Sequence, residues 1–373
     1  MKRKTDPRFR SAAKRFFMAV GALGALFLLY VGGVLAFGAW TTYVPPDQAP
    51  AEAVRKGGTA SLADSTLSFM IWNIGYAGLG AEVEFFYEHS SLVSSGRTIR
   101  AEKDISQAYF REIEQFIAAQ KVDFFLLQEI DRPSRRSHST DQVAALANRL
   151  PGFAADFFVN YQVCWVPVPL LEPWHAYGQV SSGLATYSRV QPTSSVRYQL
   201  PGQFAWPSRM FMLDRCIGVS RFSLANGNEL VVVNVHNEAY DQGGKIKRQQ
   251  LAFLRQLLEK EYAKGNYIVA GGDWNQSPPF FKPESLQPAF TRFSEQIPLD
   301  PDFMPPTWRW VYDPGHPTNR SIKEPYQKGE TEVALIDFFL ISPNIRVHRV
   351  KTLDQQFRAS DHQPVWMEVR LIR

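Results

Sequence analysis

An uninterrupted apolar stretch near the N-terminus constrains this chain more than any other feature. From Phe16 to Trp40 no residue is charged, and the positions are rich in Leu, Val, Ala, Gly and Phe. About twenty such residues suffice to cross the hydrocarbon of a bilayer as a helix. We therefore expect residues 16–40 to form a transmembrane anchor, preceded by a basic tail at residues 1–15.

The charges that flank this stretch predict its orientation. Seven Lys or Arg against one Asp give residues 1–15 a net charge of +6, and acidic Asp47 and Glu52 follow the stretch. The positive-inside rule then predicts a cytoplasmic N-terminus, with the rest of the chain outside the cytoplasm. A cleaved signal peptide is the alternative, but its apolar region normally runs only about 7–15 residues.

The basic tail also carries all of the excess positive charge. The whole chain has a formal net charge of +5, so the part after residue 15 sums to −1. A protein that binds long duplex nucleic acid usually carries clustered Lys and Arg on its folded domain. The near-neutral domain therefore argues against a non-specific DNA binder, although a local basic patch stays open.

The rest of the chain divides into a linker and one large domain. Residues 41–64 hold three prolines and two glycines with few large apolar side chains, which predicts a linker that holds the domain off the bilayer. Residues 65–373 then form the folded domain. Its two cysteines, Cys164 and Cys216, could pair in an oxidising compartment or stay free as packing residues.

Short apolar runs rich in β-forming residues alternate with helical patterns in this domain, which predicts a mixed α/β fold. Strands are predicted at 67–72, 123–128, 184–187, 230–235, 267–270, 335–341 and 364–371. Helices are predicted at 105–119, 141–149 and 245–264. Pro-rich and aromatic sequence between Pro278 and Lys328 favours long loops over a separate domain.

Polar residues follow or interrupt the apolar runs, mostly at strand ends, where side chains from different strands can converge. The candidates are Asn73, Glu129, Asn234, His236, Asp273, Asn275, Asp337, Asp361 and His362. Each alone is a weak signal, because Asp and Asn commonly cap helices and form turns. Together they supply the groups that metal-assisted hydrolysis of a phosphate ester needs.

Oxygen ligands and a base come from four of these residues. Glu129 and Asp361 suit Mg²⁺ or Mn²⁺, and Mg²⁺ typically keeps waters and substrate phosphate beside one or two carboxylates. Asp273 and Asn275 are two apart, so on an extended segment they would face one side and orient a water molecule.

Two histidines complete the predicted chemistry. His236 and a protonated His362 could donate hydrogen bonds to the charge that develops on phosphorus. Asp337 could keep His362 charged, because a neighbouring carboxylate raises the pKa of a histidine.

These motifs, in this order, resemble the endonuclease/exonuclease/phosphatase superfamily from about Leu67 to Leu371. The segments GGDWN (271–275) and SDH (360–362) are the most specific, and SGLATYSR (182–189) is similar to the central strand of the family. The resemblance implies a four-layer α/β sandwich of two packed mixed sheets flanked by helices, here preceded by one transmembrane helix, with the active site at one end.

The resemblance also implies a role for each candidate. Asn73 would organise the phosphate or metal, Glu129 would bind the metal, and His236 would contact the phosphate. Asp273 and Asn275 would surround the attacking water. Asp361 and His362, with Asp337 behind them, would complete the site. Gly75 stands where several nucleases of the superfamily carry an acidic residue, so we expect one metal rather than two. Asp273 would activate water for in-line attack, with metal and His362 stabilising the leaving oxygen.

Substrate contacts are predicted only from loop-like positions. Arg135 and Arg136 could grip a second phosphate or an anionic headgroup, or could lie in a solvated loop. Asn234 and Tyr240 are further candidates for substrate contact. Other aromatic or basic side chains could line a pocket, touch the membrane or pack in the core: Trp174, Tyr177, Trp206, Arg209 and Arg215.

The tether and the near-neutral domain favour a lipid headgroup or another small phosphoester as substrate. An extracytoplasmic nuclease acting on DNA or RNA is the alternative, and phosphodiesterase and phosphomonoesterase activities both stay open. A catalytically inactive scaffold is disfavoured, because no metal or base residue is missing. No protein partner is predicted.

Overall fold

The computed structural model describes residues 7–59, 62, 65–241, 243–286 and 298–372. Predictions for residues 1–6 of the basic tail, for 60–61 and 63–64 of the linker, and for 287–297 of the loop region lie outside the described residues.

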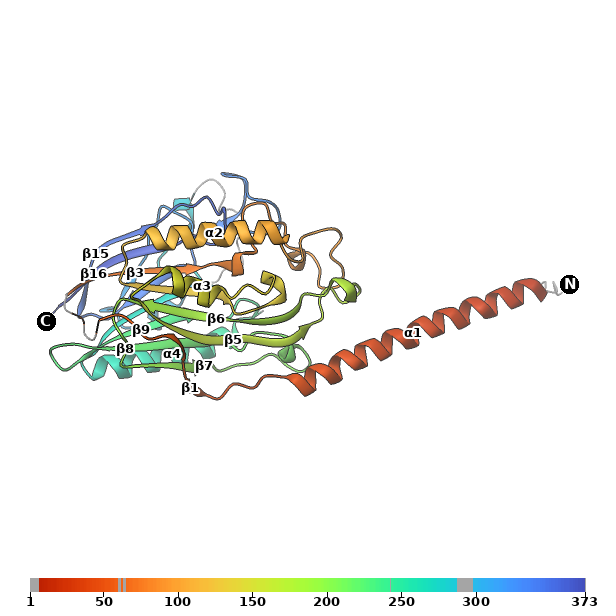
Figure 1. The fold of residues 1–373 in the computed structure, drawn as a ribbon, viewed down its shortest axis with the longest axis horizontal. Helices are drawn as coiled ribbons and strands as arrows, with labels where there is room; N and C mark the ends of the chain where they lie inside the picture. The colour runs from red at the N-terminus through yellow and green to blue at the C-terminus, as the bar shows by residue number, and fades with distance from the viewer. Residues whose placement is uncertain (1–6, 60–61, 63–64, 242, 287–297, 373) are drawn as a thin grey trace.

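One long helix stands apart from a layered domain. Helix α1 spans Pro7–Thr41 and leaves the domain as a single rod (Figure 1). Its segment Ser11–Thr41 is long and apolar enough to cross a membrane, and none of its most apolar window is buried by the rest of the chain. The helix therefore includes the predicted span of residues 16–40 and extends beyond both of its ends.

Two mixed seven-stranded sheets form the domain. The first contains, in spatial order, β1 (Gln48–Pro50), β7 (Ser194–Gln199), β8 (Cys216–Ser223), β9 (Glu229–His236), β10 (Tyr267–Asp273), β14 (Asp337–Ile341) and β11 (Arg309–Val311). The second contains β15 (Ile345–Thr352), β16 (Val365–Leu371), β3 (Thr66–Asn73), β4 (Phe124–Asp131), β6 (Gly178–Ser188), β5 (Ala154–Val166) and β2 (Glu52–Arg55). Strands β12 (Asn319–Arg320) and β13 (Val333–Ala334) form a separate small pair.

The two sheets pack face to face around an apolar layer. Phe69 and Phe124 of the second sheet belong to one buried cluster with Phe222 and Val269 of the first. The rings of Phe124 and Phe222 meet edge to face, with centroids 5.1 Å apart. Burial of this kind is the main favourable contribution to folding, so the layer fixes the two sheets against each other.

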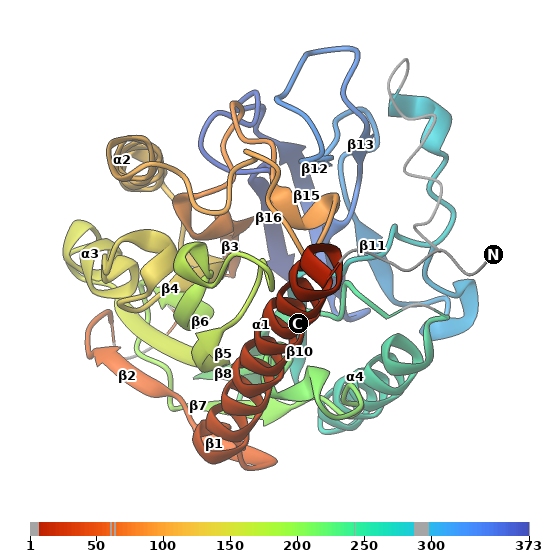
Figure 2. The ribbon, with the colours of Figure 1, turned by 90° about the vertical axis from the view of Figure 1, so that its right-hand side faces the viewer.

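Helices cover the outer face of each sheet. On the second sheet lie α2 (Lys103–Ala119) and α3 (Gln142–Arg149), and Ile113 of α2 packs in one cluster with Trp72 of β3. On the first sheet lies α4 (Lys245–Ala263), whose Leu254 packs with Val233 of β9. Figure 2 shows α2 and α3 on one side of the domain and α4 on another. The predicted four-layer sandwich is confirmed.

The predicted helices and strands are all present, with ends shifted by a few residues. Asp141 caps α3 by accepting a hydrogen bond from the Ala144 amide, and Gly265 follows α4 with a φ of 86°. In the region 278–328, predicted as long loops, the described residues form short 3₁₀ turns and the two short strands β11 and β12. The run at 335–341 begins as buried chain and becomes β14 only at Asp337.

Residues 48–55 differ from the predicted linker. Strand β1 pairs with β7 at the edge of the first sheet, and β2 pairs with β5 at the edge of the second. Edge strands tolerate a proline such as Pro50, because its missing amide can face away from the ladder. The segment after α1 is therefore part of the fold, and residues 42–47 alone connect helix and strand.

The two cysteines are both free. Cys164 is exposed and Cys216 is buried. The alternative of a disulfide between them is thus not realised in this fold.

Candidate active site

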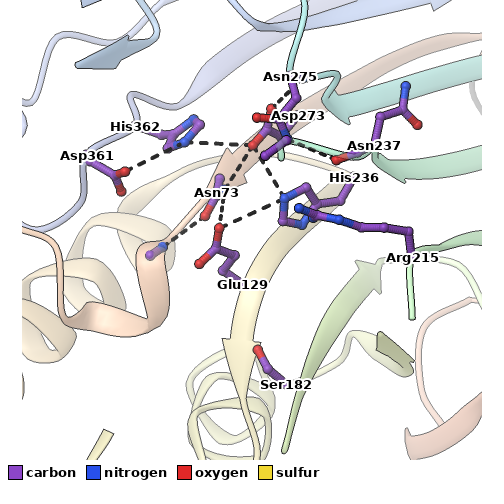
Figure 3. Close-up of polar contacts among 12 residues, drawn as sticks. Asn73, Glu129, Ser182, Arg215, His236, Asn237, Asp273, Asn275, Asp361 and His362 are labelled. Carbon is purple, nitrogen blue, oxygen red and sulfur yellow. Dashed lines mark hydrogen bonds and ion pairs between the residues drawn. The ribbon is translucent and has the colours of Figure 1, made fainter. Parts of the chain in front are cut away.

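Polar residues from both sheets converge at one end of the sandwich (Figure 3). Strands β3 and β4 run parallel in the second sheet, and β9 and β10 run parallel in the first. Asn73, Glu129, His236 and Asp273 lie at or near the C-terminal ends of these strands, and Asn275 follows just beyond β10. Asp361 and His362 join them from the segment before β16. The structure thus brings these predicted residues together.

Asn73 joins the two sheets at the centre of the site. Its Nδ2 donates to Glu129 Oε1 and to Asp273 Oδ2, each over 3.1 Å. Its Oδ1 accepts from the amide of Gly75 at 3.0 Å. One buried side-chain amide therefore fixes a carboxylate of each sheet.

Asp273 lies between two imidazoles. His236 Nε2 is 3.6 Å and His362 Nε2 is 3.7 Å from its Oδ2. Its Oδ1 accepts from the amide of Asn275 at 2.9 Å. Both oxygens are thus held in place in a buried position, as expected of a group that must receive a proton in a defined direction.

Asn275 is placed differently from the expectation that it and Asp273 share one side of an extended segment. The chain leaves β10 after Asp273, and Asn275 has a φ of 51°. Asn tolerates this left-handed region better than most residues. Its Nδ2 donates to the carbonyl of Asn237 at 2.9 Å, although Asn275 still lines the cleft.

A β-bulge aims Glu129 into the site. The pairing of β4 with β6 shifts register between Leu127 and Ile130, and Glu129 has a φ of 49°. Bulges commonly redirect a side chain next to a functional site. Without this bulge, the regular alternation of side chains along the strand would decide which face of the sheet Glu129 occupies.

Glu129 and Asp361 form a donor set that fits a hard cation. Burial raises the pKa of Asp361 to about 6, His362 opposes this shift, and the nearby carboxylate of Glu129 adds to it. Two carboxylates that repel each other, one buried and one half-buried, suit Mg²⁺ or Mn²⁺, which bind through oxygen. A second buried group, Asp273, Asp337 and His362, also could bind a metal, because its ligand atoms lie within 4.8 Å of one another.

His362 is paired with Asp337 of β14. Its Nδ1 lies 2.8 Å from Asp337 Oδ2, and the amide of Asn319 contacts its Nε2 at 3.0 Å. Burial lowers the pKa of His362, but Asp337, Asp273 and Asp361 raise it well above the ordinary value. The surrounding carboxylates therefore favour the protonated imidazole, in the position relative to Asp337 that the sequence led us to expect.

His236 has the opposite electrostatic character. Burial, followed by the charges of Arg215 and His362, lowers its pKa well below the ordinary value. Its Nδ1 is buried and makes no hydrogen bond within the described part of the chain. The surroundings thus favour a neutral His236 and a protonated His362, a separation typical of acid and base roles.

A basic wall flanks His236 that the sequence hardly indicated. Arg215 is buried with its Nε 3.5 Å from Glu238 Oε2, and its Nε and Nη1 make no hydrogen bond among the described residues. Lys247 of α4 donates to the carbonyl of Asn275 at 3.3 Å. The side-chain amide of Asn237 is also buried without a partner in the described chain. Buried polar groups without partners commonly face a ligand.

The sequence placed Arg215 among several weak loop candidates and did not indicate Asn237 or Asn319, for identifiable reasons. Arg215 directly precedes β8, which was not predicted, and Asn319 lies on β12 within the region assigned to loops. Asn237 directly follows the candidate His236, and that adjacency is the one signal that could have found it.

Of the predicted substrate contacts, Arg136 lines the cleft but is already paired. Its Nη2 donates to Asp131 Oδ1 at 2.8 Å and its guanidinium lies 3.8 Å from the centre of the Tyr76 ring. The charge of Arg136 is therefore neutralised inside the protein. Arg135 stacks instead 5.2 Å from the ring of Trp165, and it is not among the residues that line the cleft.

The other two predicted contacts, Asn234 and Tyr240, differ in whether they reach the cleft. Asn234 is fully buried between the sheets, where its Nδ2 donates to the carbonyls of Leu127 and Ala185. It shares a face of β9 with His236 but lies deeper, so the structure does not bring it to the site. Tyr240 is exposed and lines the cleft, with its ring edge to face against Tyr87.

A cleft of about 1380 Å³ surrounds these groups. Its lining combines these polar groups with aromatic and apolar side chains, among them Phe85, Tyr87, Tyr161, Tyr177, Phe211 and Leu213. The cleft can therefore contact both an anionic group and an apolar part of a ligand.

Comparison with known proteins gives a consistent result. The model of the endonuclease/exonuclease/phosphatase family matches residues 70–362. No curated protein matches the chain by sequence. An endonuclease/exonuclease/phosphatase from Beutenbergia cavernae has a similar structure, with 20% identity and a TM-score of 0.54, over 82% of this chain and 72% of that one. ANGEL2, a 2′,3′-cyclic phosphatase, is similar with 15% identity and a TM-score of 0.51, over 85% of this chain and 98% of that one.

Proposed function

The chain belongs to the endonuclease/exonuclease/phosphatase family, and from that membership we propose that it is a metal-dependent phosphoesterase acting on a lipid headgroup or another small phosphoester. The observation that carries the proposal is the hydrogen bonding of Asn73 to Glu129 of one sheet and Asp273 of the other. It supports a site in which a cation and an attacking water are held side by side.

Glu129 and Asp361 would hold the metal. When bound, a divalent cation would neutralise charge on the phosphate and on the leaving oxygen. We prefer these ligands to the group of Asp273, Asp337 and His362, because His362 Nδ1 and Asp337 Oδ2 already share a hydrogen bond. We propose one metal rather than two, because Gly75 stands where several nucleases of the superfamily carry an acidic residue.

Asp273 would take a proton from the attacking water. Asn73 and the amide of Asn275 hold its two oxygens, so the carboxylate cannot rotate away from the water. Asn275 itself would help to orient the water from the edge of the cleft.

The imidazoles would act on the phosphate from two directions. Neutral His236 would donate one hydrogen bond to a phosphate oxygen. Charged His362, supported by Asp337, would stabilise the leaving oxygen and supply it with a proton. Arg215 and Lys247 add positive potential on the side of His236 and would attract the anionic end of the substrate.

The lipid or small-molecule preference is supported by the apolar side chains that line the cleft and by the near-neutral domain. The alternative is an extracytoplasmic nuclease. A panel of a sphingomyelin-like phosphodiester in vesicles, an inositol phosphate and plasmid DNA would separate them, each assayed with Mg²⁺, with Mn²⁺ and with chelator. We expect hydrolysis of one of the first two, abolished by chelator. Cleavage of plasmid alone would refute the substrate preference, and full activity in chelator would refute the metal.

We also propose that α1 anchors the enzyme, with residues 1–15 in the cytoplasm and residues 65–373, the proposed catalytic domain, outside it. The helix is long and apolar enough for this role. A reporter enzyme that is active only outside the cytoplasm, fused after Arg373, should be active. Cytoplasmic activity of the fusion would overturn the orientation.

A further inference from the structure

Four exposed apolar side chains form a projection that the proposed chemistry does not use. We name Leu92, Val93, Leu171 and Trp174 the apolar tip, and their exposed fractions are 49%, 37%, 49% and 68%. Tryptophan and leucine exposed together are unusual on a surface that meets only water, and such patches commonly mark an interaction site.

The apolar tip is braced rather than loose. Its two loops are joined by a backbone hydrogen bond from the amide of Leu171 to the carbonyl of Leu92 at 2.9 Å. The carboxylate of Glu172 accepts from the backbone amide of Ser94 at 2.9 Å and from its hydroxyl at 2.7 Å. The negative charge of Glu172, which could oppose contact with an apolar phase, is thereby hydrogen-bonded within the tip.

The tip lies on the side of the domain from which α1 leaves. Figure 1 shows the yellow-green turn of residues 173–175 projecting from that side, beside the loops drawn in brown. Strand β3 also ends toward that side, so its last residue, Asn73, places the candidate active site there.

Packing fixes α1 next to the cleft. Gly38 of α1 is buried, and a Cβ added there would lie 3.0 Å from the ring of Phe211. Phe211 in turn lines the cleft. Trp40, at the end of the helix, is 84% exposed, as expected of an aromatic residue at the boundary between lipid and water.

We propose that the apolar tip docks on the bilayer that α1 spans, and so holds the mouth of the cleft against the lipid headgroups. The proposal rests on the anchor proposed above. The bilayer is the favoured partner because α1 places it permanently beside the tip, so that a weak apolar contact becomes an intramolecular one with a high effective concentration. Shallow burial of Trp and Leu is the way that peripheral elements engage a membrane interface.

The test uses the full chain in phosphatidylcholine vesicles whose acyl chains carry bromine, which quenches nearby fluorophores. In a Cys164→Ser background, an environment-sensitive probe is attached through Val93→Cys or Leu171→Cys. The matched control is Ala225→Cys, in the turn between β8 and β9. This turn precedes β9, and the active-site residue His236 is at the other end of that strand. A probe attached through Val20→Cys in α1 reports insertion of the anchor.

We expect the probes at 93 and 171 to shift to the blue and to be quenched, and the probe at 225 to do neither. Probes at 93 and 171 that behave like the probe at 225, while the probe at 20 is quenched, would overturn the docking. An unquenched probe at 20 would overturn it together with the anchor.

A charged variant separates docking from catalysis. Leu171→Asp combined with Trp174→Asp should release the probe at 93 from quenching, while leaving hydrolysis of a water-soluble phosphoester unchanged. Because the fluorescence needs no turnover, an inactive enzyme would count against the proposed function and not against the docking. Unaltered quenching in this variant would contradict the role of the tip.

Discussion

At the scale of single residues, the site depends on backbone conformations that most side chains avoid. Glu129 and Asn275 both have positive φ, at 49° and 51°. Such conformations cost on the order of 1–3 kcal/mol each and persist where the surroundings enforce them. Here they aim one carboxylate at the proposed metal position and turn the chain directly after Asp273.

We expect Asp273→Asn to lower kcat/KM by at least about 10²-fold, because an amide cannot accept the proton from water. Steady-state hydrolysis of the preferred phosphoester in Mg²⁺ measures this. Asp354→Asn, in an exposed loop, serves as the control and should retain the wild-type rate. An Asp273→Asn enzyme within about tenfold of wild type would show that another group is the base.

Asp361 links pH, metal and stability. Its pKa of about 6 in the folded chain exceeds the ordinary value of 3.8, so the native state binds this proton more tightly than the unfolded state. Stability without metal therefore falls as pH rises from 3.8 to 6, and the deficit is complete above 6. The deficit is on the order of 3 kcal/mol.

Asp361→Asn should accordingly raise the Tm of the metal-free protein at neutral pH by roughly 4–8 °C. It should also abolish most of the stabilisation that Mg²⁺ gives to the wild type. Thermal unfolding with chelator and with Mg²⁺ tests both effects. A lower Tm in chelator, or an undiminished response to Mg²⁺, would remove Asp361 from the metal site.

At the scale of elements, the close approach of β9 and β10 is what brings His236 beside Asp273. Gly272 has a φ of 144°, and an added Cβ would lie 2.1 Å from the carbonyl oxygen of Val235. No side chain fits between these backbones. The second glycine of GGDWN is therefore a requirement of strand packing next to the proposed base.

We expect Gly272→Ala to destabilise the fold by about 3 kcal/mol or more, because the backbone of β9 would have to move. The matched control is Gly227→Ala, which also has a positive φ, of 84°, but nothing within 4 Å of the added Cβ. That change should cost only about 1 kcal/mol. Equal unfolding free energies for the two variants in urea would mean that the close contact is relieved cheaply.

Element type also explains what the sequence could and could not predict. Strands whose residues are nearly all buried, such as β4 and β10, were visible as apolar runs. Strand β5 ends in alternating exposed and buried positions, and β15 is rich in Arg and Lys, so neither formed such a run. Site residues at the ends of visible strands were therefore found. Arg215 and Asn319, next to or on elements that were not visible, were missed or left among many loop candidates.

At the scale of the whole molecule, the arrangement joins a membrane-compatible helix to a domain whose candidate active site lies on the helix side. Figure 2, which looks at that side, shows α1 extending toward the viewer in front of the sheets. Distance to the bilayer is then a property of the fold as much as of the connecting chain, because Gly38 packs on Phe211.

A chain that begins at Asp47 should keep β1 and β2 and hydrolyse a water-soluble phosphoester as fast as the full protein. On a lipid substrate in vesicles it should be slower by roughly 10²-fold, because it loses the effective concentration that the anchor provides. Comparing the two rates for each protein tests this. Equal rates on vesicles would mean that α1 contributes nothing to access.

A chain that begins at Ser65 lacks both strands, and its Tm should be lower than that of the Asp47 chain.

Residues 48–55 finally determine how the domain would respond to mechanical force. Within two adjacent short strands the chain pairs first with β7 of one sheet and then with β5 of the other. A pull on α1, such as viscous drag on the helix in a moving membrane, would load the pairing of β1 with β7 first. Only after β1 detached would the force reach β2 and the second sheet.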